Sequence, residues 1–168
     1  MSRRLAEGFR PQTAVVAFGA NLGDRAATIA QAADDLRAHP LVDSVLVAEP
    51  IDSVAVKPDG PDADAPAYLN TVALVRTRLA PSLLLRLLHE IEHAHGRVRE
   101  ERWGDRTLDL DLIAYGDVTA DLPTMQVPHP RAAERDFVLR PWHSIDPAAV
   151  LPGAGRVADL LDALGGER

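Results

Sequence analysis

The sequence predicts an α+β domain with a ferredoxin-like βαββαβ core, in which helices pack on one face of an antiparallel sheet. The 168 residues are 46% hydrophobic and 26% charged, the normal balance for one domain with its own buried core. Short β-branched apolar runs alternate with segments of helical periodicity, in the order β-α-β-β-α-β. We expect residues 1–12 to form an N-terminal tail and residues 13–165 the single domain, including a C-terminal extension of the core.

The first part of the chain supplies a strand, a helix and a second strand. Thr13–Phe18 is a short apolar run closed by Gly19, which predicts a buried strand. Asp24 then caps a segment of helical apolar spacing that stops at His39-Pro40. Val42–Val47 predicts the second strand.

The middle of the chain contains a loop, a strand and the second helix. Glu49–Pro66 holds four prolines and five acidic residues, so we expect an exposed loop that does not continue the sheet. Tyr68–Val75 returns to strand character. A helix is expected from Pro81 to near Gly96, because its apolar residues form one stripe. These residues are Leu83, Leu84, Leu87, Leu88 and Ile91.

The last part of the chain completes the sheet and adds the C-terminal extension. Residues 97–106 are polar and rich in arginine, and the first half of Leu108–Tyr115 alternates at period two, which predicts a fourth strand. Residues 128–146 are expected to form a loop with a short helix, and residues 156–164 a final amphipathic helix.

Composition excludes several functions. The chain has no cysteine, which removes disulfides and thiolate metal sites and fits a reducing compartment. A net charge of −7 argues against nucleic-acid binding. Of 18 basic residues 17 are arginine, and the only lysine is Lys57, so a Walker-type phosphate loop is absent. No apolar run follows the N-terminus, so we expect a cytoplasmic protein without a membrane anchor.

Two aspartates lie two residues apart on the fourth predicted strand. Asp109 and Asp111 therefore project from one face, about 6–7 Å apart at their Cα atoms, while Leu108, Leu110 and Leu112 pack the other face. Two hard carboxylates this close suit Mg²⁺, which fills its remaining positions with water and phosphate oxygens. The alternative interpretation is the solvated outer face of an ordinary half-buried strand.

The residues before this strand favour a site for a polyphosphate. Four arginines lie within ten residues: Arg97, Arg99, Arg102 and Arg106. Guanidinium groups beside a divalent-metal site are suited to holding phosphate oxygens. Trp103 adds a flat apolar surface in the same segment, either as a wall for a ligand or as a residue folded back onto the core.

Four ordered sequence blocks carry a resemblance to a known enzyme family. They are residues 17–25 (AFGANLGDR), 68–70 (YLN), 97–112 (RVREERWGDRTLDLDL), and 127–130 (VPHP) followed by 135–139 (RDFVL). Together they resemble the 6-hydroxymethyl-7,8-dihydropterin pyrophosphokinases of the folate pathway. The resemblance covers roughly residues 13 to 165. Residues 50–56 depart from the family pattern, because the usual tyrosine, threonine and proline are missing there.

The resemblance implies ATP-dependent transfer of the terminal diphosphate to the pterin hydroxymethyl group, leaving AMP. It implies two Mg²⁺ ions held by Asp109 and Asp111, and a catalytic set of Arg97, Arg106, Asp109 and Asp111. It implies ATP binding by Arg97, Trp103, Arg106, Leu112, His129 and Arg135. It implies pterin binding by Tyr68, Asn70, Trp103 and Phe137, with the Tyr68 and Phe137 rings enclosing the pterin. We expect a monomer, with other folate-pathway enzymes as candidate partners.

Two other functions remain as alternatives. His89, Glu90 and His93 match the H-E-x-x-H pattern, in which two histidines on one helix face bind Zn²⁺ and the glutamate acts as general base. The third histidine of the longer metalloprotease pattern would fall at position 99, which is Arg99. A catalytically silent nucleotide- or pterin-binding module is the other alternative, since fold does not imply function.

Overall fold

The structure is a computed structural model that describes residues 10–53, 55–57, 60–62, 67–96 and 108–165. The main sheet contains β1 (Gln12–Ala20), β2 (Val42–Val47), β3 (Ile51–Ser53), β6 (Tyr68–Thr77) and β7 (Asp109–Tyr115). The helices are α2 (Arg25–Arg37), α3 (Pro81–Ala94), α4 (Asp136–Ile145) and α5 (Val157–Gly165), with a 3-10 helix at Ala132–Glu134. Short ribbons pair β4 (Ala55–Lys57) with β5 (Gly60–Asp62), β8 (Ala120–Leu122) with β9 (Met125–Val127), and β10 (Val150–Leu151) with β11 (Gly155–Arg156).

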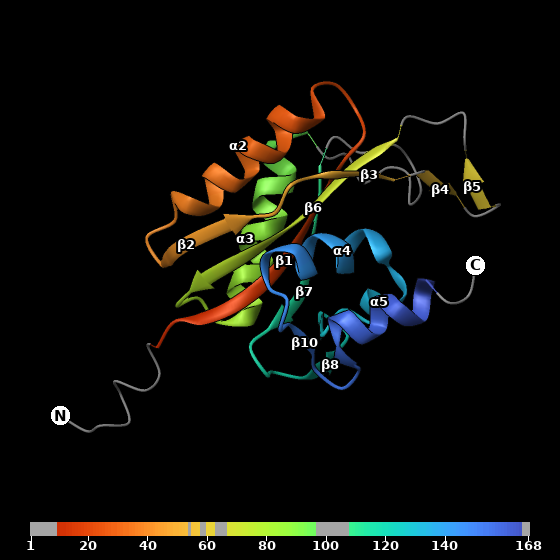
Figure 1. The fold of residues 1–168 in the computed structure, drawn as a ribbon. Helices are drawn as coiled ribbons and strands as arrows, with labels where there is room; N and C mark the ends of the chain where they lie inside the picture. The colour runs from red at the N-terminus through yellow and green to blue at the C-terminus, as the bar shows by residue number, and fades with distance from the viewer. Residues whose placement is uncertain (1–9, 54, 58–59, 63–66, 97–107, 166–168) are drawn as a thin grey trace.

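The sheet has the topology that the sequence predicts. Its order is β2-β6-β1-β7, and each adjacent pair is antiparallel. Counted in chain order, the four long strands lie second-third-first-fourth, so each helix crosses between strands that are not neighbours. This confirms the ferredoxin-like core (Figure 1). The predicted cap is also present, because the Asp24 side chain accepts a hydrogen bond from the Ala27 N–H at the start of α2.

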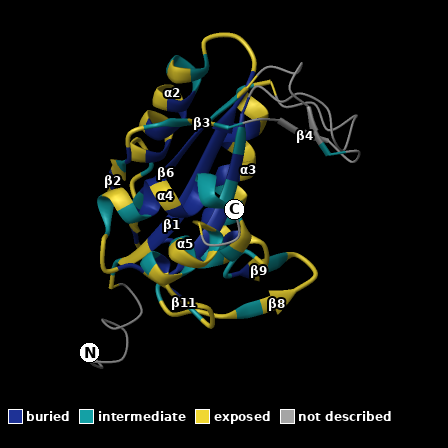
Figure 2. Cartoon of the chain, turned by 45° about the vertical axis from the view of Figure 1, so that its right-hand side comes forward, coloured by how far each residue is buried: buried dark blue, intermediate teal, exposed yellow. Residues whose placement is uncertain are grey.

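Helices cover both faces of the sheet, whereas the sequence predicted helices on one face. Val16 and Phe18 of β1 pack with α2 and α3, while Val15 and Ala17 face the other way. The second face is covered by the C-terminal extension, through apolar residues such as Trp142 of α4. Figures 1 and 2 show the buried strands between these two helix layers. The C-terminal extension is therefore part of the buried core. Successive residues of β1 point to opposite faces of the sheet, and both sets are buried.

One local expectation was wrong. Ile51–Ser53 joins the sheet as β3 and pairs with β6, although residues 49–66 were expected to form only a loop. This is physically possible because β3 lies at the sheet edge and Pro50 stands outside its ladder. The short helix expected within residues 128–146 is α4, a ten-residue helix over Asp136–Ile145 that contains Pro141. Its buried face, which includes Leu139 and Trp142, stabilises the helix despite the missing proline N–H. Within the described residues, no helix is long and apolar enough to cross a membrane.

Candidate active site

Two rows of residues cross the sheet where β7 begins. In the first row Asp109 pairs with Gly19, and Gly19 pairs on its other side with Asn70. In the second row Asp111 pairs with Ala17. Opposite residues of an antiparallel pair, and residues two apart on one strand, lie on the same face. The structure therefore brings Asp109, Asp111 and Asn70 to one face of the sheet, the face that α4 and α5 cover.

Arg135 connects this face to the start of α4. Asp109 and Asp111 are both half-buried, and Arg135 Nη1 lies 3.5 Å from Asp111 Oδ2. The guanidinium carbon of Arg135 also lies 5.7 Å from the centre of the Phe137 ring, within the range of a cation–π contact. One arginine thus joins a carboxylate of β7 to an aromatic ring of α4, and the predicted ATP-binding and pterin-binding residues meet at this point.

A buried carboxylate of α3 holds β7 between the two aspartates. Glu92 is only 1% exposed, and its Oε2 accepts a 3.0 Å hydrogen bond from the backbone N–H of Leu110. Because β7 ends the sheet order, an N–H on its outer side needs a partner outside the sheet. Sequence reasoning missed Glu92. The available signal was an acidic residue adjacent to Ile91 of the apolar stripe, at the buried face of the helix.

Replacing Glu92 with alanine is expected to lower the free energy of unfolding by about 2 kcal/mol, because the Leu110 N–H loses its buried acceptor. Glu92→Gln keeps an acceptor oxygen and should lower the free energy of unfolding by less. Urea unfolding measures the free energy for both variants. Glu90→Ala is the matched control, since Glu90 is exposed and pairs with Arg86 on the same helix, 3.2 Å away. Equal losses for Glu92→Ala and Glu90→Ala would contradict this role.

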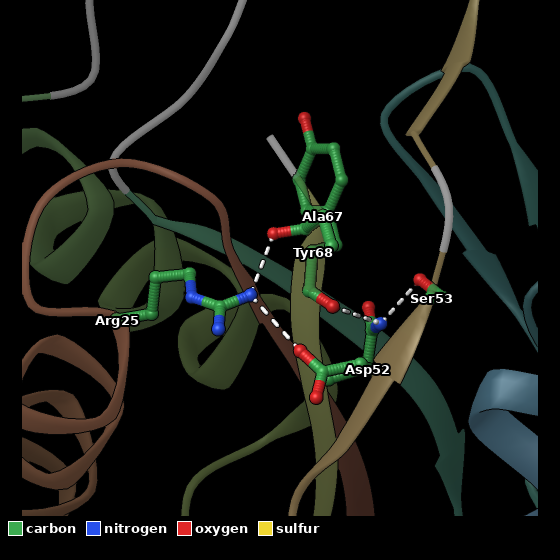
Figure 3. Close-up of polar contacts among 6 residues, drawn as sticks. Arg25, Asp52, Ser53, Ala67 and Tyr68 are labelled. Carbon is green, nitrogen blue, oxygen red and sulfur yellow. Dashed lines mark hydrogen bonds and ion pairs between the residues drawn. The ribbon is translucent and has the colours of Figure 1, made fainter. Parts of the chain in front are cut away.

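The amide of Asn70 has a defined orientation. Its Nδ2 donates to Ser53 Oγ at 2.5 Å and to the Tyr68 carbonyl at 3.3 Å (Figure 3). A backbone carbonyl can only accept, so the atom facing Tyr68 must be the amide nitrogen. The oxygen Oδ1 then lies toward Gly19, 3.5 Å from where a Cβ on that residue would be. Asn70 consequently offers an acceptor over Gly19. Ser53 is a second residue that sequence reasoning missed.

A cleft runs along the outer edge of β7. Its volume is about 390 Å³, and its walls come from α3, β7, β8, β9 and the residues after β9. Three predicted site residues line it: Asp111, Leu112 and His129. The backbone N–H of His129 donates to the Ile113 carbonyl at 2.8 Å, which fixes this segment against the strand edge. The size lies within the usual range for small-molecule sites.

His129 is neutral at physiological pH. Burial lowers its pKa from 6.5 to about 4, and the nearby charges of Arg135 and Arg131 act in the same direction. Its Nδ1 accepts a 3.1 Å hydrogen bond from the Arg131 N–H. A neutral imidazole carries one proton, so that proton is on Nε2. His129 therefore presents an uncharged N–H donor at the cleft that it lines.

This lowered pKa predicts a pH dependence of stability. Between pH 6.5 and about 4 the unfolded chain binds more protons at His129 than the folded protein does. The contribution of neutral His129 to the free energy of unfolding is therefore complete above pH 6.5 and is lost as the pH falls toward 4. His129→Asn keeps an acceptor for the Arg131 N–H but does not titrate. Urea unfolding at about pH 7 and about pH 5 should therefore show a smaller pH-dependent loss for this variant than for the wild type. His39→Asn, which makes the same substitution at a similar Nδ1 contact with the Leu41 N–H away from the cleft, is the control.

The H-E-x-x-H pattern does not assemble into a metal site. His93 is exposed, and Glu90 accepts a hydrogen bond from Arg86 Nε at 3.2 Å. His89 lines the cleft beside Asp111. Across the described ranges, no group of three or more His, Cys, Asp or Glu side chains could hold a metal ion. Zinc hydrolases use three protein ligands, so these residues do not favour that alternative.

The remaining predicted site residues divide into two groups. Tyr68 opens β6, and its Cδ1 would lie 3.6 Å from a Cβ on Gly19, so its ring borders the same space as Asn70 Oδ1. Arg97, Trp103 and Arg106 lie outside the described residues.

Comparisons with known proteins agree with this geometry. A family model described as 7,8-dihydro-6-hydroxymethylpterin-pyrophosphokinase matches residues 15–147. The chain is 41% identical over 152 residues to the 2-amino-4-hydroxy-6-hydroxymethyldihydropteridine pyrophosphokinase of Pseudomonas aeruginosa, covering 90% of this chain and 91% of the relative. The enzyme of the same name from Haemophilus influenzae is 36% identical over 149 residues, covering 89% and 91%.

A solved structure supports the fold. The crystal structure of Plasmodium falciparum HPPK-DHPS A437G with STZ-DHP superposes with a TM-score of 0.69 at 12% sequence identity. The match covers 97% of this chain and 47% of the Plasmodium chain. At this identity the likeness concerns architecture alone.

Proposed function

The chain belongs to the 7,8-dihydro-6-hydroxymethylpterin-pyrophosphokinase family, and from that membership we propose how its own residues carry out the reaction. It transfers a pyrophosphoryl group to 6-hydroxymethyl-7,8-dihydropterin in folate biosynthesis, with ATP as co-substrate. The observation that carries the proposal is the shared sheet face of Asp109, Asp111 and Asn70, with Arg135 beside Asp111. This face can hold a polyphosphate and a polar heterocycle side by side.

Asp109 and Asp111 fit a Mg²⁺ site. Both are half-buried carboxylates on one face of β7, opposite the small residues Gly19 and Ala17, which leave room beside them. Mg²⁺ is commonly held by one or two carboxylates and completes its shell with water and substrate phosphates. The two aspartates would hold the two ions that the family resemblance implies. When bound, Mg²⁺ would neutralise charge on the phosphate oxygens.

The cleft along β7 takes the nucleotide. Leu112 supplies an apolar wall for the base, and the His129 Nε2–H donates to an acceptor of the nucleotide. Arg135 places its positive charge where the phosphate chain approaches Asp111. The family resemblance implies that Arg97 and Arg106 bind further phosphate oxygens and that Trp103 closes over the site. The cleft lining and the Arg135 contact support the roles of Leu112, His129 and Arg135.

The space over Gly19 takes the pterin. Asn70 Oδ1 accepts a hydrogen bond from an N–H of the ring, since its amide nitrogen is already held by Ser53 and Tyr68. The Tyr68 ring borders this space, and Phe137 lies at the start of α4 over the same sheet face. Flat aromatic surfaces bind a flat heterocycle by stacking. In this proposal the hydroxymethyl group points toward Asp109, which pairs with Gly19 on the side opposite Asn70.

The chemistry needs positioning more than covalent participation by the protein. The substrate hydroxyl oxygen forms a bond to the β-phosphorus of ATP, its proton is released, and the bond from that phosphorus to the oxygen bridging the α- and β-phosphates breaks. AMP leaves with the bridging oxygen. The protein holds the two substrates in line and balances charge through Arg135, Arg97 and Arg106.

The direct test is to incubate the purified protein with ATP, Mg²⁺ and 6-hydroxymethyl-7,8-dihydropterin and separate the products by chromatography. We expect AMP and the pterin diphosphate in equal amounts, with activity dependent on Mg²⁺. Binding of both substrates without AMP would indicate the silent module. Hydrolysis that needs zinc and is independent of the pterin would indicate the zinc enzyme. We further propose that the protein is cytoplasmic, which the absence of cysteine supports, and that it is a monomer.

A further inference from the structure

Arg25 joins two segments that are distant in sequence. Its Nη1 donates to Asp52 Oδ1 at 3.0 Å and to the Ala67 carbonyl at 2.7 Å (Figure 3). Asp52 belongs to β3, and Ala67 immediately precedes β6. One guanidinium nitrogen therefore binds the chain on both sides of residues 53–66, at the points where it leaves the sheet and returns.

These two contacts continue directly to the Asn70 amide. Asp52 precedes Ser53, whose hydroxyl accepts from Asn70 Nδ2 at 2.5 Å. Ala67 precedes Tyr68, whose carbonyl accepts from the same nitrogen at 3.3 Å. The contacts form a closed ring through Arg25, the β3 residues, Asn70 and the start of β6, which Figure 3 draws together. Both acceptors that orient Asn70 are thus covalent neighbours of groups that Arg25 binds.

We propose that Arg25 is a positioning residue for pterin recognition, and this rests on the proposed function of Asn70. By holding Asp52 and Ala67 at a fixed separation, Arg25 keeps Ser53 Oγ and the Tyr68 carbonyl where both reach Asn70 Nδ2. The amide oxygen then stays directed over Gly19. Without Arg25 the amide can rotate, and a ligand N–H meets its acceptor less often.

The Arg25–Asp52 ion pair is exposed, so the effect of Arg25 on Asn70 can be separated from an effect on the stability of the fold. The Arg25 and Asp52 side chains are 32% and 67% exposed, and ion pairs of this kind stabilise folded proteins little. The Arg25 contacts also lie outside both buried cores. Removing Arg25 should therefore disturb the orientation of Asn70 while leaving the fold in place.

Arg25→Ala is expected to raise the pterin Kd and KM about tenfold, with the KM for ATP and the thermal midpoint close to wild type. Isothermal titration with 6-hydroxymethyl-7,8-dihydropterin, in the presence of Mg²⁺ and a non-hydrolysable ATP analogue, measures the Kd. Ser53→Ala should give the same selective effect. In the Arg25→Ala/Ser53→Ala double variant the pterin Kd should rise by less than the product of the two single rises, because both residues act on the Asn70 amide. Arg25→Lys, which keeps the charge opposite Asp52, should restore part of the affinity.

The matched control is Arg37→Ala. Arg37 lies on the same helix and also pairs with an aspartate and a backbone carbonyl, at Asp34 and Val45. Neither partner is a covalent neighbour of Ser53 or Tyr68, whose oxygens accept from Asn70. It should leave the pterin KM unchanged. An unchanged pterin Kd in Arg25→Ala, or equal rises in the pterin and ATP constants, would overturn the inference. Failure of the wild-type protein to bind the pterin would instead overturn the proposed function.

Discussion

Asp111→Asn is expected to lower kcat by about 10³-fold, because the amide keeps the size of the carboxylate but removes its charge. Asp111 lines the nucleotide cleft, and its Oδ2 also lies 3.5 Å from Arg135 Nη1. The same change should raise the Mg²⁺ concentration needed for half-maximal activity. A half-buried side chain on this face can lose its charge without unfolding the sheet, so the thermal midpoint should move little.

Steady-state kinetics with varied Mg²⁺ measures this effect, and Asp117→Asn is its control. Asp117 is an exposed aspartate in the turn after β7, so its replacement makes the same chemical change on the same chain segment outside the site. Turnover near the wild-type rate in Asp111→Asn would rule out the proposed metal role. A large fall in kcat in both variants would point to a general effect of net charge rather than to a role of Asp111 in the site.

The site parts that lie on one strand could be predicted from the sequence. Asp109 and Asp111 alternate with Leu108, Leu110 and Leu112, and a period of two assigns the two sets to opposite faces without knowledge of the fold. The structure places these leucines in the core with α2 and α3, as expected. The four long strands and the first two helices followed from the same local patterns.

The parts that depend on strand register could not be predicted in this way. Nothing local to Asn70 indicates that Gly19 separates it from Asp109, because register depends on packing and connections along the whole sheet. Ser53 and Arg25 were missed for the same reason, since their contacts cross between segments distant in sequence. The short helix expected within residues 128–146 is stabilised by burial against the second sheet face despite Pro141, and local sequence patterns do not indicate which face it covers.

Gly19→Val is expected to raise the pterin KM about 10²-fold while leaving the fold at least as stable as the wild type. A Cβ at Gly19 would lie 3.5 Å from Asn70 Oδ1 and 3.6 Å from Tyr68 Cδ1, which are ordinary contacts, so alanine fits without displacing either residue. The branched methyl groups of valine extend further into the space assigned to the pterin. Gly19→Ala should therefore give a smaller rise than valine.

Stability and activity should move in opposite directions in this series. Glycine in a strand costs about 0.5–1 kcal/mol relative to alanine, and valine favours strands. Gly19 is not among the positive-φ glycines, so no backbone strain opposes the change. Ser44→Val, an exposed position of β2, is the control for adding valine to this sheet and should leave the pterin KM unchanged. A normal pterin KM in Gly19→Val would show that the substrate does not occupy the space between Asn70 and Asp109.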